Sequence, residues 1–471
     1  MYAHNVNVNQ KRKQGTMRRL YATQALLADG WASDVQVDIG ADGRIAAVTP
    51  GTQPSPGTET LDILLPAPAN LHSHAFQRAM AGLTERRGPD PRDSFWTWRR
   101  LMFRFLDHLT PDDVEAIAAF VQMEMLEAGY ACSAEFHYLH HQPGGAVYAD
   151  LAEMSARIAA AAATSGIGLT LLPVLYEHGG CDGRPLSPGQ IRFGNTPDRF
   201  ARLADGARAA LASLPPDTGF GLAPHSLRAV SHAGLRAVQA MGAGPVHMHL
   251  AEQVAEVDEV QAAWGARPVR WLLDNAPVDN RWCLIHCTQM EPDETEALAR
   301  TGAVAGLCPI TESSLGDGIF DGVRWVGTGG RFGIGSDSNI RISLSEELRT
   351  LEYSQRLRDR ARAALATREC STGRVLFDGA VHGGAQAAGR ASGAIAPGLW
   401  ADLVALDGGA VDLYGRRGDT VLDAWIFAGD DRMIRAVWAA GRALVRDGRH
   451  VARDAITRRY ARTQERLRDA L

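Results

Sequence analysis

The chain has 471 residues, more than one ordinary domain needs, so we expect two domains. Hydrophobic residues make up 45% of it and charged residues 22%, and the formal net charge is -5. This balance excludes a disordered chain and offers no basic surface for nucleic acid, so a small molecule is the expected partner. No apolar run reaches the roughly 18 residues of a membrane span, and we expect a cytoplasmic protein without a membrane partner.

The cysteine and lysine content of the chain excludes several kinds of site and mechanism. The six cysteines are scattered without CxxC pairs, which indicates reduced thiols rather than a disulfide framework or a structural zinc cluster. The only lysines are Lys11 and Lys13, in the polar N-terminal stretch. A mechanism that needs a lysine in the folded body is therefore excluded, and this includes a lysine-bridged two-metal centre.

The two ends of the chain share one β-rich pattern. Residues 1–16 are polar and basic without periodicity, and we expect a disordered tail there. From 17 to 66, short β-like runs alternate with Gly, Asp and Pro turns, and the same pattern returns from 390 to 450. The two stretches predict one small β-sandwich domain formed from both chain ends, with two unrelated β-caps as the alternative. A C-terminal helix is expected over 451–471.

The middle of the chain, residues 67–389, alternates short apolar runs with Ala-rich amphipathic stretches. This is the strand–helix alternation of a parallel barrel, so the predicted fold class is α/β, a (β/α)8 TIM barrel. The segment 111–129 has a favoured helix start, because Pro111 is followed by acidic residues. No helix of comparable quality separates the last two strands, and we expect an irregular loop there. The expected strands lie at 63–74, 130–138, 168–177, 220–227, 245–252, 281–288, 303–312 and 331–338.

Most of these strands end in a polar or ionisable residue, and in a (β/α)8 barrel such ends converge on one face. His72 and His74 alternate along a strand, so both imidazoles can reach one metal ion. The pair alone is weak evidence, because a strand histidine is often a hydrogen-bonded core residue. Adding His249 and Asp337 gives three imidazoles and a carboxylate, which suit Zn(II), although Fe(II) or another divalent ion fits the same ligands. The polar strand ends are His72, His74, Tyr138, His225, His249, Glu252, His286 and Asp337.

Four segments resemble the amidohydrolase superfamily, in particular its mononuclear deaminase branch: PAPANLHSHAFQRAMAGLTE, HMHLAEQ, LIHCTQ and GIGSDSN. Within this branch the chain is most similar to the formimidoylglutamate deiminase family of histidine degradation, over about residues 17–450. HxH and HLAE are shared across the branch and indicate its chemistry, whereas HSHAFQRAMAGLTE is the narrower marker. The resemblance implies a hydrolase of linear amidines that converts N-formimidoyl-L-glutamate to N-formyl-L-glutamate and ammonia.

The resemblance also implies roles for single residues. Glu252 would transfer protons, and His286 would orient the attacking water with help from Asp337. A Zn(II) ion lowers the pKa of its bound water from about 15.7 toward about 7, so hydroxide becomes available near neutral pH. Positioned acid–base groups typically contribute about 10²–10⁴ in rate. One metal ion per chain is implied, with the ligands His72, His74, His249 and Asp337.

N-formimidoyl-L-glutamate carries two carboxylates, so its site needs cationic or hydroxylic donors away from the metal. The resemblance implies that His225 lies near the reacting end. Arg99 has another interpretation, because it or its neighbour Arg100 could stack on Trp96 or Trp98 at a surface. If Arg99 stacks in this way, Arg100 is the candidate that binds the substrate in its place. The residues implied around the glutamate part are Gln77, Arg99, Tyr138 and Arg228.

Three alternatives remain beside this hypothesis. The nearest is another mononuclear deaminase that acts on a guanine-like or adenosine-like ring, but that site favours aromatic walls and amide donors, whereas the candidates here are rich in arginine. A non-catalytic barrel would be expected to lose ligands or the glutamate, yet all six positions are filled. A two-metal hydrolase lacks its bridging lysine. Homodimers are common among similar proteins, and a homodimer is expected on that resemblance alone.

Overall fold

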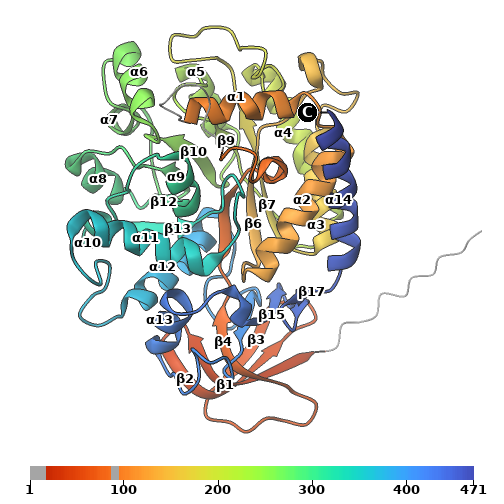
Figure 1. Cartoon of the computed structure of the whole chain (residues 1–471), viewed down its shortest axis with the longest axis vertical. Coiled ribbons are helices and arrows are strands. Elements are labelled where there is room, and N and C mark those ends of the chain that lie inside the picture. Colours follow the sequence, from red (N-terminus) through yellow and green to blue (C-terminus); the bar gives the residue numbers. More distant parts are fainter. Residues whose placement is uncertain (1–16, 86–94, 471) are drawn as a thin grey trace, which may run out of the picture.

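The computed structural model describes residues 17–85 and 95–470. Parallel strands surrounded by helices form one part of the molecule, and a second group of strands lies against one end of it (Figure 1). The tail expected over residues 1–16 lies outside the described residues. Among the described helices, none is both long and apolar enough to cross a membrane.

The barrel strands follow one another around the wall in sequence order and pair in parallel, with β8 and β9 both pairing with β7. One four-stranded sheet and one five-stranded sheet make up the wall, and β8 and β9 share the fourth position, so the wall has eight positions. Single bridges, Ser73 to Asp337 and Ser226 to His249, close the ring. The predicted (β/α)8 barrel is confirmed. Its strands are β5 (Ala69–Ser73), β6 (Cys132–His137), β7 (Gly168–Leu175), β8 (Gly219–Phe220), β9 (Ala223–Pro224), β10 (Val246–Leu250), β11 (Trp282–His286), β12 (Val304–Leu307) and β13 (Arg331–Ile334).

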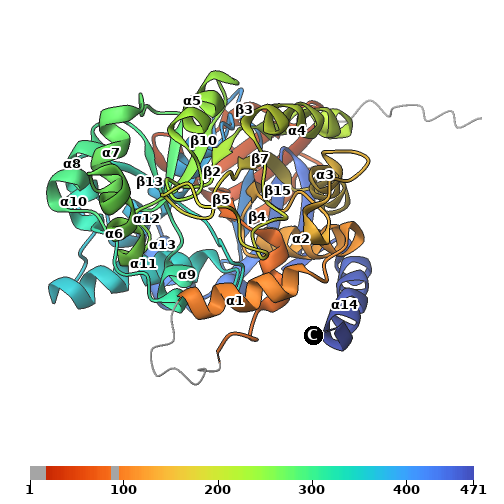
Figure 2. The ribbon, with the colours of Figure 1, turned by 90° about the horizontal axis from the view of Figure 1, so that it is seen from above.

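Helices surround these strands, as the view from above shows (Figure 2). The predicted start of α2 is confirmed: Pro111 is its first residue, and the side chains and backbones of Thr110 and Asp113 form a reciprocal capping box. The helices are α1 (Phe95–Leu106), α2 (Pro111–Glu127), α3 (Glu153–Ser165), α4 (Pro197–Ala210), α5 (His232–Ala240), α6 (Val254–Trp264), α7 (Pro268–Asn275), α8 (Pro292–Ala299), α11 (Leu344–Asp359) and α12 (Thr372–Ala387), with 3₁₀ turns η1 (Ala75–Met80), η2 (Pro143–Gly145) and η3 (Leu211–Ser213).

The segment between the last two barrel strands is not the irregular loop that we expected. It contains α9 (Pro309–Leu315) and α10 (Gly322–Gly327). Pro309 begins α9, and the Asp321 side chain caps α10 by accepting a hydrogen bond from the Arg324 amide. The two helices have seven and six residues, so neither is long enough for a helical hydrophobic period to show in the sequence.

The β-domain is one continuous sheet of eight strands drawn from both ends of the chain (Figure 1). β4 joins the two halves, because it pairs in parallel with β1 and antiparallel with β14. The prediction of one domain from both ends is confirmed, while its exact boundaries stay a prediction. The order is β17-β16-β15-β14-β4-β1-β2-β3, with β1 (Arg18–Leu27), β2 (Gly30–Ile39), β3 (Ile45–Thr49), β4 (Glu59–Pro66), β14 (Leu403–Leu406), β15 (Ile434–Ala439), β16 (Arg442–Arg446) and β17 (Arg449–His450).

The C-terminal part of the chain returns to the barrel after this sheet. α13 (Asp419–Phe427) and η4 (Asp431–Met433) precede β15, and α14 (Arg453–Ala470) follows β17. α14 lies along α2 in both views (Figures 1 and 2), where the rings of Phe120 and Tyr460 stack with centroids 3.9 Å apart. The last helix therefore covers part of the barrel wall.

Candidate active site

The carboxyl ends of the barrel strands gather the predicted site residues around one pocket. Every one of them except His72 lines it, and His72 lies fully buried beneath the other ligand candidates. Arg99 is among the lining residues, and its guanidinium also lies over the Phe103 ring, 5.2 Å from the centroid. The Arg100 side chain lies outside the described part of the chain. The predicted residues therefore come from six strand ends, with Gln77 from η1 and Arg99 from α1.

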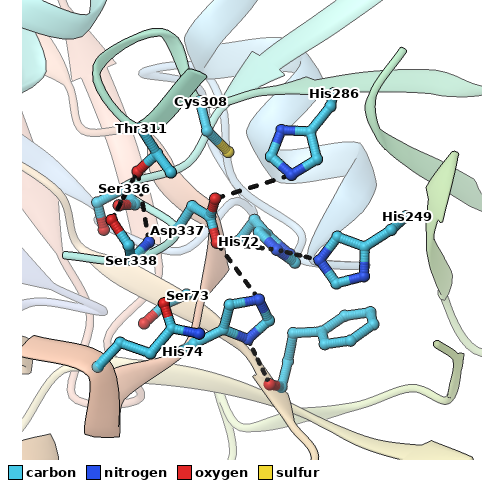
Figure 3. Close-up of polar contacts among 12 residues, drawn as sticks. His72, Ser73, His74, His249, His286, Cys308, Thr311, Ser336, Asp337 and Ser338 are labelled. Atoms are coloured by element: carbon cyan, nitrogen blue, oxygen red, sulfur yellow. Dashed lines mark hydrogen bonds and ion pairs between the residues drawn. The ribbon is translucent and has the colours of Figure 1, made fainter. Parts of the chain in front are cut away.

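Four side chains have the spacing of metal ligands. Figure 3 shows the rings of His72, His74 and His249 turned toward the carboxylate of Asp337. The Nε2 atoms of His72 and His249 are 3.2 Å apart, and Asp337 Oδ1 lies 3.3 Å from His74 Nε2 and 3.6 Å from His72 Nε2. An ion with four tetrahedral bonds of about 2.0–2.1 Å separates its ligand atoms by roughly 3.3 Å. These distances fit one such ion.

Two of the imidazoles are oriented by hydrogen bonds to backbone carbonyl groups. His74 Nδ1 lies 3.0 Å from the Phe136 oxygen, and His249 Nδ1 lies 3.0 Å from the His225 oxygen. A carbonyl can only accept, so each ring donates from Nδ1 and keeps its Nε2 lone pair for the site. This is the arrangement that metal-binding histidines require.

The electrostatics of the cluster also favour a cation. Burial lowers the pKa of the three ligand histidines, that of His74 to about 3, so the rings are neutral near pH 7. Burial raises the pKa of Asp337 to about 7. A bound divalent ion would stabilise the carboxylate form and would use the neutral nitrogens, so the donor set fits such an ion.

The backbone brings distant segments together here. The Asp337 amide donates to the His72 oxygen, and the His74 amide donates to the Asp337 oxygen, both at 2.9 Å. His286 and Asp337 have left-handed backbones, with φ of 71° and 46°. Such conformations cost on the order of 1–3 kcal/mol each in residues other than glycine, and they concentrate at functional sites. The strain directs both side chains into the pocket.

His286 lies among three carboxylates. Its Nε2 is 3.9 Å from Glu252 Oε1 and 3.7 Å from Asp337 Oδ2, and its Nδ1 is 3.2 Å from Glu312 Oε1. Burial alone would lower the pKa of this imidazole, but Glu252, Glu312 and Asp337 raise it to about 10. His286 and Glu252 can therefore exchange protons with a molecule held between them and the ligand cluster.

The pocket also carries hydrogen-bond donors outside the ligand cluster. Gln77 Nε2 donates to the Tyr138 hydroxyl at 2.7 Å. Arg228 is buried, with Nη2 3.6 Å from Glu252 Oε2, and the carboxylates of Glu256 and Glu252 outweigh its desolvation and raise its pKa. The pKa of His225 is lowered by burial and by the nearby arginines, so this ring is neutral. The pocket therefore contains cationic and hydroxylic donors in addition to the candidate ligand cluster.

Several residues in or next to the pocket are not among those predicted from the sequence. Tyr176 lines the pocket one residue beyond the end of β7, and the rule that selected Tyr138 after β6 would also have found it. Glu312, in α9, gave no comparable signal, because its contact with His286 depends on a short helix that periodicity does not reveal. The other lining residues that were not predicted are Trp98, Met102, Phe193, Leu315 and Ser338.

A barrel with this cluster at its strand ends is typical of metal-dependent hydrolases. The amidohydrolase family model matches residues 63–444, and the model for the N-terminal domain of the formimidoylglutamate deiminase HutF matches residues 17–62. Formimidoylglutamate deiminase of Pseudomonas aeruginosa is 50% identical over 96% of this chain and 100% of its own length. The chain belongs to the amidohydrolase family and, within it, to the formimidoylglutamate deiminases.

Solved structures show the same fold. A crystal structure of an amidohydrolase from Brucella melitensis superposes with a TM-score of 0.92 at 49% identity, covering 96% of this chain and 99% of the other. An adenosine deaminase from Xanthomonas campestris, solved with bound zinc, has a TM-score of 0.78 at 21% identity, covering 96% and 98%. The second likeness concerns the fold alone.

Proposed function

We propose that this protein hydrolyses N-formimidoyl-L-glutamate to N-formyl-L-glutamate and ammonia, as a step in the degradation of histidine. One observation carries the proposal: a single pocket is lined both by candidate metal ligands and by the cationic groups of Arg99 and Arg228. This combination matches a substrate with an amidine at one end and two carboxylates. The 50% identity to the Pseudomonas aeruginosa deiminase, over 96% of the chain, supports the same assignment.

The metal in this proposal is Zn(II), one ion per chain, and Fe(II) or another divalent ion remains possible by ligand type. A divalent ion at this site supplies a Lewis acid and lowers the pKa of water toward about 7. Three nearby imidazole nitrogens within 4.8 Å of one another and the 3.2–3.6 Å contacts described above support it. The residues that would hold it are His72, His74, His249 and Asp337.

Proton transfer is the task of Glu252 and His286. Hydrolysis adds water across the C=N bond and releases ammonia, so both protons of the water have to move, one after the other, from its oxygen to the departing nitrogen. Glu252 carries these protons, while His286 and Asp337 hold the attacking oxygen by hydrogen bonds. The burial of all three groups and the distances of 3.9 Å and 3.7 Å from His286 Nε2 to Glu252 and Asp337 support these roles.

The glutamate part of the substrate binds to the cationic and polar residues that line the same pocket. Arg99 and Arg228 bind carboxylates, Gln77 and Tyr138 add hydrogen bonds, and neutral His225 lies next to the reacting amidine. Arg228 is already 3.6 Å from Glu252, so it holds the proton carrier and the substrate within one charge network. Several amide groups would be needed to hydrogen-bond to the edge atoms of a purine. Gln77 supplies the only side-chain amide among the described residues that line this pocket.

An ammonia assay with metal analysis of the same sample tests the proposal. N-formimidoyl-L-glutamate should release ammonia, guanine and adenosine should not, and the sample should contain about one metal ion per chain. The Asp337→Ala variant should lose both metal and turnover, because it lacks the anionic ligand. Turnover of guanine alone would overturn the substrate assignment, and full metal content in the variant would remove Asp337 from the ligand set.

Assembly and location stay predictions. We propose a homodimer in the cytoplasm, as the resemblance and the composition suggested. Size-exclusion chromatography with light scattering measures the mass, and a mass equal to one chain of 50.7 kDa would contradict the dimer.

A further inference from the structure

The hydroxyl of Tyr176 has an incomplete set of hydrogen bonds. Tyr176 lines the pocket and is only 3% exposed. Its oxygen accepts one hydrogen bond from Arg99 Nη2 at 3.0 Å and another from Gln190 Nε2 at 2.8 Å. A phenol oxygen accepts two hydrogen bonds and donates one, so both of its acceptor positions are used.

The direction of these bonds is fixed by the partners. A guanidinium has no acceptor. Gln190 Oε1 accepts from the amide and the hydroxyl of Ser187, at 2.9 and 2.7 Å, so the amide nitrogen of Gln190 must face Tyr176. Both neighbours of the phenol are therefore donors, and its own proton has no acceptor among the residues that the structure describes.

The residues around Tyr176 indicate which group accepts the remaining hydrogen bond from its hydroxyl. Arg99 and Arg228 line the same pocket, and the ring of neutral His225 packs against Tyr176 with centroids 4.5 Å apart. A buried O–H beside a guanidinium favours an anionic acceptor, because a carboxylate accepts from both groups at once. We infer that Tyr176 is a substrate-binding residue whose hydroxyl donates to the same carboxylate that Arg99 binds, an inference that rests on the proposed function.

Tyr176 and Arg99 together would contribute to specificity for an acidic substrate. Gln190, held by Ser187, fixes the phenol oxygen, and the phenol in turn fixes the guanidinium of Arg99. The carboxylate then meets one charged donor and one neutral donor that are already oriented, so binding orders few side chains. An apolar group in that place would leave the Tyr176 proton without an acceptor.

Tyr176→Phe tests this inference with three substrates. N-formimidoyl-L-glutamate should lose about 10- to 100-fold in kcat/KM, mostly through KM, because the lost bond is to a charged group present before and during the reaction. N-formimidoyl-4-aminobutyrate lacks the α-carboxylate, and N-formimidoyl-L-2-aminobutyrate lacks the γ-carboxylate. The loss should vanish with one of the two and persist with the other. An unchanged kcat/KM for the full substrate, or the same loss with both analogues, would overturn it.

The effect of the hydroxyl must be separated from its effect on Arg99. Tyr176→Phe is therefore repeated in an Arg99→Met background. A direct bond predicts a further loss of about 10-fold or more there, whereas no further loss would mean that Tyr176 acts only through Arg99. Tyr130→Phe is a matched control, because that buried hydroxyl lies outside the pocket and has no hydrogen-bond partner among the described residues.

Failure of the proposed function would be visible first. If the unaltered chain releases no ammonia from N-formimidoyl-L-glutamate, the proposed function fails before any variant is compared. If it does and Tyr176→Phe matches it on all three substrates, only the role of Tyr176 fails.

Discussion

Glu252 has two neighbours of different character. One carboxylate oxygen faces the His286 imidazole and the other faces the Arg228 guanidinium. In the proposed mechanism the guanidinium holds the carboxylate in position, and the imidazole is its neighbour on the reacting side. Glu252 can therefore take part in proton transfer without leaving its place.

The Glu252→Gln variant tests this role. We expect turnover to fall by about 10²–10⁴, because an amide cannot carry the proton, while metal content stays the same. Ammonia release and metal analysis measure the two quantities. Asp258→Asn, on an exposed position of α6, should leave both unchanged. Retained turnover in Glu252→Gln would remove this residue from the mechanism.

At the scale of single elements, the short helix α9 supplies a carboxylate that contacts His286. Its Glu312 accepts a hydrogen bond from the Cys308 amide at 2.8 Å and lies 3.2 Å from His286 Nδ1. The carboxylate thus ties the end of β12 to the His286 imidazole at the end of β11. Glu312 does not line the pocket, so it acts by positioning His286.

Substitutions of Glu312 should separate its charge from its hydrogen bond. Glu312→Ala removes both and should lower kcat by about 10- to 100-fold with little change in KM, since no substrate contact is lost. Glu312→Gln keeps an acceptor oxygen and should retain more of the activity. Ser314→Ala, on the exposed side of the same helix, is the control. An Ala variant with the original kcat would contradict the positioning role.

Most residues of this site can be predicted from the sequence, because the carboxyl ends of the barrel strands meet on one face. The alternation of His72 and His74 along one strand, and the position of Asp337 at the end of another, predict that the three side chains lie close together. Glu312 could not be predicted, because its contact requires the course of a seven-residue helix. Tyr176 also follows a strand end, but its role depends on the direction of two hydrogen bonds, which the sequence does not contain.

At the scale of the whole molecule, a buried group of charges joins the barrel to the β-domain. Arg390 donates to both oxygens of Asp402, at 2.6 and 2.9 Å, and to Asp217 Oδ2 at 2.8 Å. Arg442, from β16, donates to both oxygens of Asp217. Asp402 also accepts from the Ala440 amide near the end of β15. The side chains of Arg390, Asp217 and Asp402 are each 2% exposed.

Removing the central cation of this group should destabilise the protein. Arg390→Met leaves two buried carboxylates with fewer partners, and we expect the free energy of unfolding to fall by about 3–5 kcal/mol. Urea denaturation measures it. Arg432→Met, which breaks the exposed pair with Asp430, should leave the midpoint in place. Equal midpoints for the two variants would contradict the role of Arg390.

The same group predicts a response to acid. Burial alone would raise the pKa of Asp217, but Arg442 and Arg390 outweigh it and lower the pKa. A lowered pKa contributes stability above the unfolded value of about 3.9, and this contribution is lost as the pH falls through the folded value. Asp217→Asn should therefore be less stable than the unaltered chain at pH 7, and the difference should shrink below about pH 4. A constant difference would contradict this account.

The order of the β-domain sheet has a consequence for how the protein is made. β4 emerges from the ribosome early, but its partner β14 begins only at Leu403, after the entire barrel has been synthesised. Until then, one edge of β4 has no strand to pair with, and an open edge invites pairing with other chains. The barrel must therefore be synthesised before the nascent chain can close this edge, and chains released before that point would carry it exposed to chaperones and proteases.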